Sequence, residues 1–72
     1  MQLVKVESSN IEAIGHEGNV LRVEFKTGAA YDYKGVPAEV HRDLMQSNSK
    51  GRFLDQHIKK PPGKYPFEPV AA

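Results

Sequence analysis

The sequence of 72 residues contains no cysteine and no tryptophan. Without cysteine, the chain can form neither the disulfide framework of a small secreted domain nor a thiolate zinc site. It also lacks an apolar run near the roughly 20 residues that a membrane-spanning helix needs, and its N-terminus lacks the apolar core of a signal peptide. At this length we expect one small cytoplasmic domain without a membrane address.

Motifs of catalysis and of nucleotide binding are missing as well. The six glycines form neither a GxGxxG nor a Walker pattern, whose backbone would cradle phosphates. No serine lies in a nucleophile elbow, and capping or turn duty explains the serines more simply. The three histidines, His16, His41 and His57, lack metalloprotease spacing, so a zinc site would need distant carboxylates. We therefore expect no enzymatic activity, no metal and no cofactor.

The chain has no large excess of either sign of charge, because ten Lys and Arg nearly balance nine Asp and Glu, for a net charge of +1. The distribution along the chain is uneven. Residues 1–46 carry five cations and seven carboxylates, a net charge of −2, whereas residues 47–64 carry five cations against Asp55 alone, a net charge of +4. Such an asymmetry marks either a binding face or a merely solvated helix face and tail.

Two segments, residues 20–26 and 29–34, alternate apolar and polar side chains, as half-buried strands do. A three-residue loop over 26–28, with Gly28 in the left-handed conformation, keeps the two apolar faces together. This register pairs the strands residue by residue: Phe25 with Ala29, Val23 with Tyr31, Leu21 with Tyr33, and Arg22 with Asp32. Residues 11–16 predict a further strand, and residues 3–6 a short additional edge strand.

The second half of the chain changes to a helical period. Val36, Val40 and Leu44 recur every four residues around Pro37, which suits a first helical turn, and predict a helix over 37–46. Residues 49–60 predict a second helix, for which Ser49 is a candidate cap.

The apolar stripe of the second helix includes His57, which we expect to be partly buried. The Pro-Pro-Gly sequence at 61–63 stops this helix, because proline lacks the amide donor. The tail, residues 65–72, is expected to run extended, with Tyr65 and Phe67 either folded back on the core or exposed.

These elements predict an α+β domain over residues 1–64. A three-stranded antiparallel β-meander, with the short N-terminal edge strand as an option, precedes two short helices that pack on one face of the sheet. The expected core consists of Leu21, Val23, Phe25, Tyr31, Val40, Leu44, Phe53 and Ile58.

The two helices expected over 37–60 do not favour a DNA-binding helix-turn-helix. The turn at 47–49 lacks the usual glycine, and the second helix commits Phe53, Leu54 and Ile58 to packing. Generic contacts of the basic residues with phosphate remain an alternative.

Several short segments together resemble the KTSC domain family over roughly residues 5–60. The segments that carry the resemblance are 8–11, 13–15, 21–25, 31–33, 36–37 and 49–53, together with Gly28 and Ile58. Members occur at the C-terminus of some lysyl-tRNA synthetases and as free-standing small proteins of bacteria and phages. The resemblance implies an accessory binding module without catalysis. Among free-standing members, the chain is similar to phage-encoded regulators that bind bacterial RNA polymerase and alter transcription.

We therefore expect a protein-binding regulator whose partner is bacterial RNA polymerase, acting by inhibition of initiation or by antitermination. Its location would be the bacterial cytoplasm, that of the host if a phage encodes it. The expected partner-binding residues are Lys50, Arg52, Lys59, Lys60, Tyr65 and Phe67, because Arg and aromatic residues are enriched in interfaces. The alternative is an RNA- or tRNA-binding accessory module that uses the basic second helix. It is less favoured because Tyr31 and Tyr33 fall on the face that the helices should cover, where they could not stack on bases.

Overall fold

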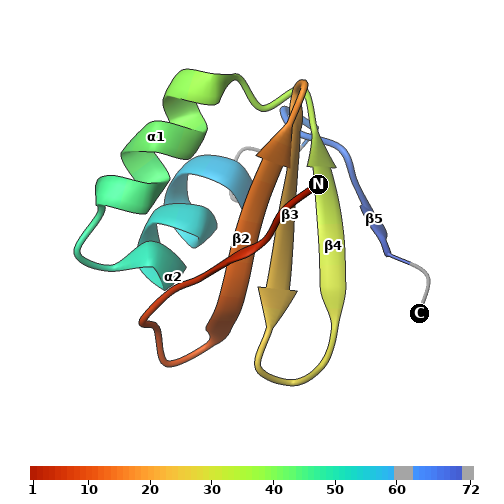
Figure 1. Ribbon diagram of the computed structural model, residues 1–72. Coiled ribbons are helices and arrows are strands. Elements are labelled where there is room, and N and C mark those ends of the chain that lie inside the picture. The colour runs from red at the N-terminus through yellow and green to blue at the C-terminus, as the bar shows by residue number, and fades with distance from the viewer. Residues whose placement is uncertain (60–62, 71–72) are drawn as a thin grey trace.

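The computed structural model describes residues 1–59 and 63–70, which form an antiparallel sheet and two helical segments (Figure 1). The strands follow one another in the sheet in chain order: β1 (Val4–Lys5), β2 (Ile11–Glu17), β3 (Val20–Phe25), β4 (Ala30–Lys34) and β5 (Phe67–Pro69). The α+β class is confirmed. The predicted three-stranded meander is present as β2–β4, and the optional N-terminal edge strand is present as β1. The sheet of the described residues nevertheless has five strands, because the tail adds β5 at the other edge.

The fifth strand is the larger departure, since it recruits the tail that was expected merely to run extended. The amide of Lys34 donates to the carbonyl of Pro66 (2.7 Å), and the amide of Val70 donates to the carbonyl of Ala30 (2.9 Å). Residues 67 and 69 therefore direct their backbone groups away from β4, so Pro69 gives up an amide only at the outer edge. This placement lets a proline-rich tail pair with β4 and also blunts the new edge.

The register between β3 and β4 confirms the predicted loop. Leu21 pairs with Tyr33, Arg22 with Asp32 and Val23 with Tyr31, and the amide of Phe25 donates to the carbonyl of Ala29 (2.8 Å). Gly28 has φ +96°, a conformation that favours glycine. On the outer face, the Arg22 guanidinium donates two hydrogen bonds to the Asp32 carboxylate, at 2.7 and 2.9 Å.

The N-terminal segment crosses the face of β2 that is turned away from the helices (Figure 1). A Cβ atom at Gly15 would lie 2.7 Å from Leu3 Cδ2 and 2.8 Å from the Gln2 carbonyl oxygen, so only glycine admits this crossing. A bulge between Ile11 and Ala13 shifts the register of β2. As a result Ile11 and Ile14 are both buried in the core.

The first helix, α1 (Ala38–Gln46), begins one residue later than expected, with Pro37 as its N-cap. The second predicted helix is divided into α2 (Lys50–Phe53) and a π-helical segment, η1 (Leu54–Lys59). Ser49 is the N-cap residue of α2, as predicted, but its side chain makes no cap hydrogen bond. The Ser49 amide donates to Ser47 Oγ (3.1 Å). This hydrogen bond lies within the turn between α1 and α2 and stabilises it locally.

The wider turn of η1 also changes which side chains face the sheet. Leu54 and Ile58 are buried, whereas His57 is exposed and lies against the Phe53 ring, with 4.6 Å between ring centroids. The expectation of a partly buried His57 is therefore wrong, because the π-helical turn carries it away from the core.

Half of the predicted core residues are fully buried: Leu21, Val23, Leu44 and Ile58. The other four pack against this core but stay partly accessible: Phe25, Tyr31, Val40 and Phe53. Tyr31 stays partly exposed because the helices lie on the β2 side of the sheet and leave β4 and β5 on the far side (Figure 1). Among the described residues, no helix is long and apolar enough to cross a membrane.

Candidate binding groove

A row of aromatic rings crosses the helix-facing side of the sheet where the helices leave it open. Tyr31 on β4 makes edge-to-face contacts with Phe25 on β3 (6.1 Å between centroids) and with Phe67 on β5 (5.8 Å). The Phe67 ring also lies 5.7 Å from that of Tyr33. Phe67 remains 64% exposed. The row therefore continues the core outward onto an accessible surface.

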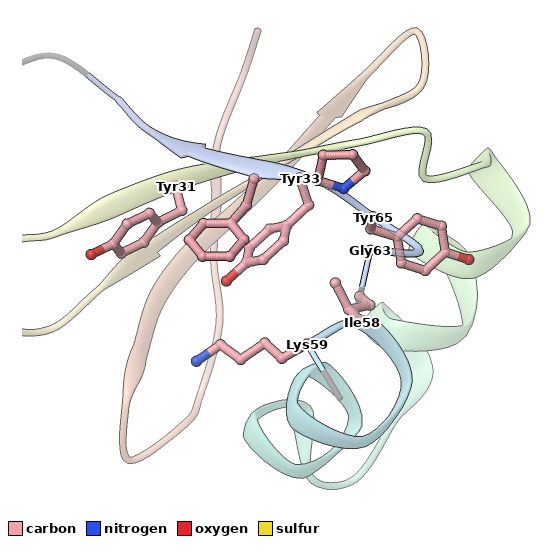
Figure 2. A pocket seen from close by; sticks show the side chains of 8 residues that line it. Tyr31, Tyr33, Ile58, Lys59, Gly63 and Tyr65 are labelled. Atoms are coloured by element: carbon pink, nitrogen blue, oxygen red, sulfur yellow. The ribbon is translucent and has the colours of Figure 1, made fainter. Parts of the chain in front are cut away.

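These rings form one wall of a cavity of about 720 Å³, a volume within the range of ligand sites, roughly 300–1,000 Å³. Its lining consists of Tyr31, Tyr33, Ile58, Lys59, Gly63, Tyr65, Pro66 and Phe67. Figure 2 shows the rings of Tyr31 and Tyr33 on one side, the Lys59 side chain on the other, and Tyr65 with Gly63 at one end. Lys59 provides the one charged side chain among these lining residues.

Lys59, the last residue of η1, lies at the junction of three cavities. Its ammonium nitrogen is 5.0 Å from the centroid of the Phe25 ring, in cation–π contact. It lines the main cavity and two smaller ones, of about 520 and 400 Å³. The described part of the chain places no carboxylate within ion-pair distance of it. We call the main cavity and the adjoining cavity of 520 Å³ the Lys59 groove.

Tyr33 supplies a hydroxyl group at the base of the groove. The residue is 3% exposed. Burial raises the pKa of the Tyr33 phenol, and the neighbouring Tyr31 raises it further. Tyr33 therefore stays protonated and can donate a hydrogen bond at neutral pH. The groove thus combines apolar walls with an ammonium group and a hydroxyl donor.

The opposite face of the sheet is electrostatically different. There the hydrogen bonds from Arg22 hold the pKa of Asp32 below its ordinary value, although partial burial opposes the shift. A second ion pair joins Lys34 to Glu68 at 3.0 Å. Because these charges neutralise one another, the face offers a poor platform for a charged partner.

The three histidines form no metal site. His16 Nε2 donates to the Val36 carbonyl (2.7 Å) and the His16 ring stacks on that of His41, with 4.9 Å between centroids, while His57 stands apart against Phe53. Over residues 1–59 and 63–70, no three His, Asp or Glu side chains converge as ligands for a metal ion.

Comparison with known proteins assigns a family to this fold and groove. Residues 7–65 match the sequence profile of the KTSC domain. The chain belongs to the KTSC domain family. A KTSC domain protein from Yersinia pestis has a crystal structure that superimposes with a TM-score of 0.87 at 38% identity, covering 97% of each chain.

Two curated relatives extend the comparison. An uncharacterized protein of Stutzerimonas stutzeri is 39% identical over 61 residues, which cover 82% of this chain and 86% of the relative. A lysine–tRNA ligase of Nostoc punctiforme is 37% identical over 71 residues, which cover 96% of this chain but 12% of the ligase. The KTSC fold therefore occurs both as a small protein and as a minor part of a large enzyme.

Within this KTSC domain, the predicted partner-binding residues separate into distinct places. Lys59, Tyr65 and Phe67 line the main cavity. Arg52 joins Lys59 in the 400 Å³ cavity, where Asp55 also lies. Lys60 falls outside the described residues.

Lys50 lies apart from the groove, because its ammonium donates to the Ser47 carbonyl (3.1 Å) in the turn after α1. The basic segment is therefore divided: Lys50 serves the turn, whereas Lys59 serves the groove.

Sequence reasoning missed Phe25, Tyr31 and Tyr33 as groove residues, because it placed Phe25 and Tyr31 in the core and Tyr33 on the face that the helices should cover. A usable signal was present in the tail, where Phe67 and Pro69 alternate about the charged Glu68. Taken as a strand, that alternation adds an apolar column beside the tyrosines and makes the sheet wider than two short helices can cover.

Proposed function

We propose that this KTSC domain protein is a non-enzymatic regulator that binds a partner protein in the Lys59 groove. The observation that carries the proposal is the aromatic row with Phe67 64% exposed at its outer end. Aromatic side chains beside a cation are typical of the residues that dominate interface energies. The ammonium group of Lys59 pairs with no carboxylate of the described residues. Its positive charge favours an acidic partner surface and speeds the encounter with it.

The partner that we propose is bacterial RNA polymerase, with modulation of transcription as the outcome. Support comes from the resemblance to free-standing phage-encoded regulators that bind this enzyme. A regulator of that kind acts in the bacterial cytoplasm and needs one complementary surface and no chemistry of its own.

A second candidate is binding of RNA, and one observation favours it more than the sequence did. The helices cover Tyr33 but leave Phe67 and part of Tyr31 accessible on the sheet, where exposed aromatics can stack on bases. The similarity to part of a lysine–tRNA ligase points the same way. Against it stands the division of the basic helix, because Lys50 is engaged by the turn and Arg52 lies beside Asp55.

Direct binding measurements with purified bacterial RNA polymerase test the proposal. We expect the full chain to bind the nuclease-treated enzyme and Phe67→Ala to weaken binding at least tenfold, about 1.4 kcal/mol or more. Val4→Ala is the matched control, because Val4 is also exposed (54%) but lies on the opposite edge strand.

Binding that is lost on nuclease treatment, or that Phe67→Ala and Val4→Ala weaken equally, would contradict the proposal. In a parallel pull-down from bacterial lysate, loss of all partners after nuclease would favour the RNA-binding alternative.

A further inference from the structure

The hydroxyl group of Tyr33 is a polar atom at the wall of the main cavity. Among the described residues it makes no hydrogen bond within the chain. The residue as a whole is 3% exposed, but the hydroxyl itself remains accessible, because no buried side-chain oxygen of the described residues lacks a partner. Water can satisfy an accessible hydroxyl, and a ligand that enters the cavity can take the place of that water. Figure 2 shows this hydroxyl directed into the cavity, above the Lys59 side chain. The cavity therefore contains a donor that the fold itself does not use.

Lys59 adds a second donor to the same cavity and gives the site a sign. Its ammonium group pairs with no carboxylate of the described chain. Among residues 1–59 and 63–70, the lining of the Lys59 groove includes Lys26 and Lys59 but no acidic residue. A phenol hydroxyl and an ammonium group can both serve one anionic oxygen acceptor. The polar part of a ligand here should therefore be an anion.

The rest of the cavity selects the body that carries the anion. Ile58, Tyr31 and Phe67 provide apolar surface, and the volume of about 720 Å³ accommodates an aromatic ring with its polar substituent. Multiply charged phosphate groups are often held by arginines, and the described residues that line the main cavity include none. A single carboxylate suits one ammonium and one hydroxyl better.

We infer that the main cavity recognises a carboxylate of the partner protein together with a large apolar side chain. The carboxylate is attached to that side chain or lies next to it, and an aromatic side chain suits the cavity best. Tyr33 and Lys59 hold the carboxylate, while Tyr31, Ile58 and Phe67 enclose the side chain. This inference rests on the proposed function, since it names the feature of the partner protein that the groove reads.

A pair of small probes isolates the carboxylate. N-acetyl-phenylalanine carries a ring and a carboxylate, and N-acetyl-phenylalaninamide is the same molecule without the charge. We expect titration of the ¹⁵N-labelled full chain to move the amide signals of residues 31, 33, 59 and 67 with the acid, and the amide to bind about tenfold more weakly, which corresponds to about 1.4 kcal/mol. Equal binding of both probes, or no binding of either, would overturn the inference.

Three variants assign the recognition to named atoms. Tyr33→Phe removes the hydroxyl alone, and Lys59→Met removes the charge but keeps a long apolar stem. Each should abolish the preference for the acid over the amide. Lys5→Met is the matched control, because it removes one exposed positive charge on β1, at the edge of the sheet opposite β5, and it should keep the preference. Circular dichroism of each variant verifies the fold. A preference that survives Tyr33→Phe and Lys59→Met would refute the assignment.

The same variants separate this inference from the proposed function. If RNA polymerase binds wild type and Tyr33→Phe equally, the proposed function stands and the carboxylate inference is wrong. If the acid binds as expected but no polymerase binding is measured, the cavity is a carboxylate site and the proposed function is wrong. Stronger binding of a single-stranded oligouridylate than of the acid would assign the groove to nucleic acid and overturn the inference.

Discussion

At the scale of single residues, the histidine pair between β2 and α1 shows how packing changes chemistry. The rings of His16 and His41 lie nearly parallel, with an interplanar angle of 10°. Burial, followed by the effect of His16, lowers the pKa of His41 below its ordinary value of 6.5. The interface between helix and sheet therefore favours a neutral His41, and its stability should depend on pH.

The sign of that dependence follows from the direction of the shift. The unfolded chain binds a proton to His41 more readily than the folded chain does, so its contribution to stability is present above about pH 6.5 and declines as the pH falls below that value. We expect urea denaturation to report a lower free energy of unfolding at pH 5.5 than at pH 7.5. His41→Phe keeps an aromatic ring against His16 and should reduce this difference. An unchanged difference in the variant would show that other groups cause it.

At the scale of elements, the N-terminal segment that crosses β2 restricts which residue the strand can carry at Gly15. The N-terminal segment lies so close to Gly15 that an added Cβ atom would also come within 3.2 Å of Met1 Cγ. The constraint comes from a long-range contact rather than from the local conformation of the strand. In η1, similarly, the widened turn decides that Leu54 and Ile58 are buried and His57 is not.

Two glycine variants test the crossing. Gly15→Ala forces the backbone at Gln2 to move, and the free energy of unfolding should fall by about 1–3 kcal/mol, as for other overpacked sites. Gly51→Ala is the control, because its nearest neighbour would be Ser8 Oγ at 3.9 Å. That helical position should instead gain up to about 1 kcal/mol.

Urea denaturation measures both values, and hydrogen exchange at residues 2–5 reports whether the N-terminal segment is released in Gly15→Ala. Equal effects of the two substitutions would mean that the crossing carries no special constraint.

At the scale of the whole molecule, the groove exists because the covering layer is smaller than the sheet. Helices α1, α2 and η1 lie over the β2 side, while β5 widens the sheet on the other side (Figure 1). The match to the KTSC domain ends at residue 65, so Phe67 and the strand that presents it lie beyond the matched segment. The outer wall of the groove is thus built from the tail.

A chain that ends at residue 64 tests whether residues 1–64 form the domain by themselves. It should keep the β2–β4 meander and both helical segments, because no fully buried core residue lies in the tail, from which Tyr65 alone of the described residues packs against the core. Loss of the contacts of Phe67 with Tyr31 and Tyr33 should lower the free energy of unfolding by about 1–3 kcal/mol, at about 0.5–1.5 kcal/mol for each aromatic pair.

Circular dichroism and urea denaturation check both expectations. An unfolded truncated chain would show that β5 is integral to the domain, and an unchanged stability would show that its contacts with the tyrosines contribute nothing.

The sequence by itself determined the local structure. The alternation in β3 and β4 set their register down to the Arg22–Asp32 pair, since a slip of one residue would have turned the apolar faces apart. The four-residue spacing of Val36, Val40 and Leu44 located α1 within one residue at its start. Short-range patterns of this kind are legible because each depends on neighbours in the chain.

Only the tertiary structure decided which surfaces stay open and which charges are free. Whether Tyr31 is covered depends on how far two short helices reach across the sheet. Whether Phe67 joins it depends on a tail that pairs with a strand from the first half of the chain. Lys50 and Lys59 look alike in the sequence, yet one ends in the turn after α1 and the other at an aromatic groove. Coverage and charge pairing arise between distant segments, so no local period encodes them.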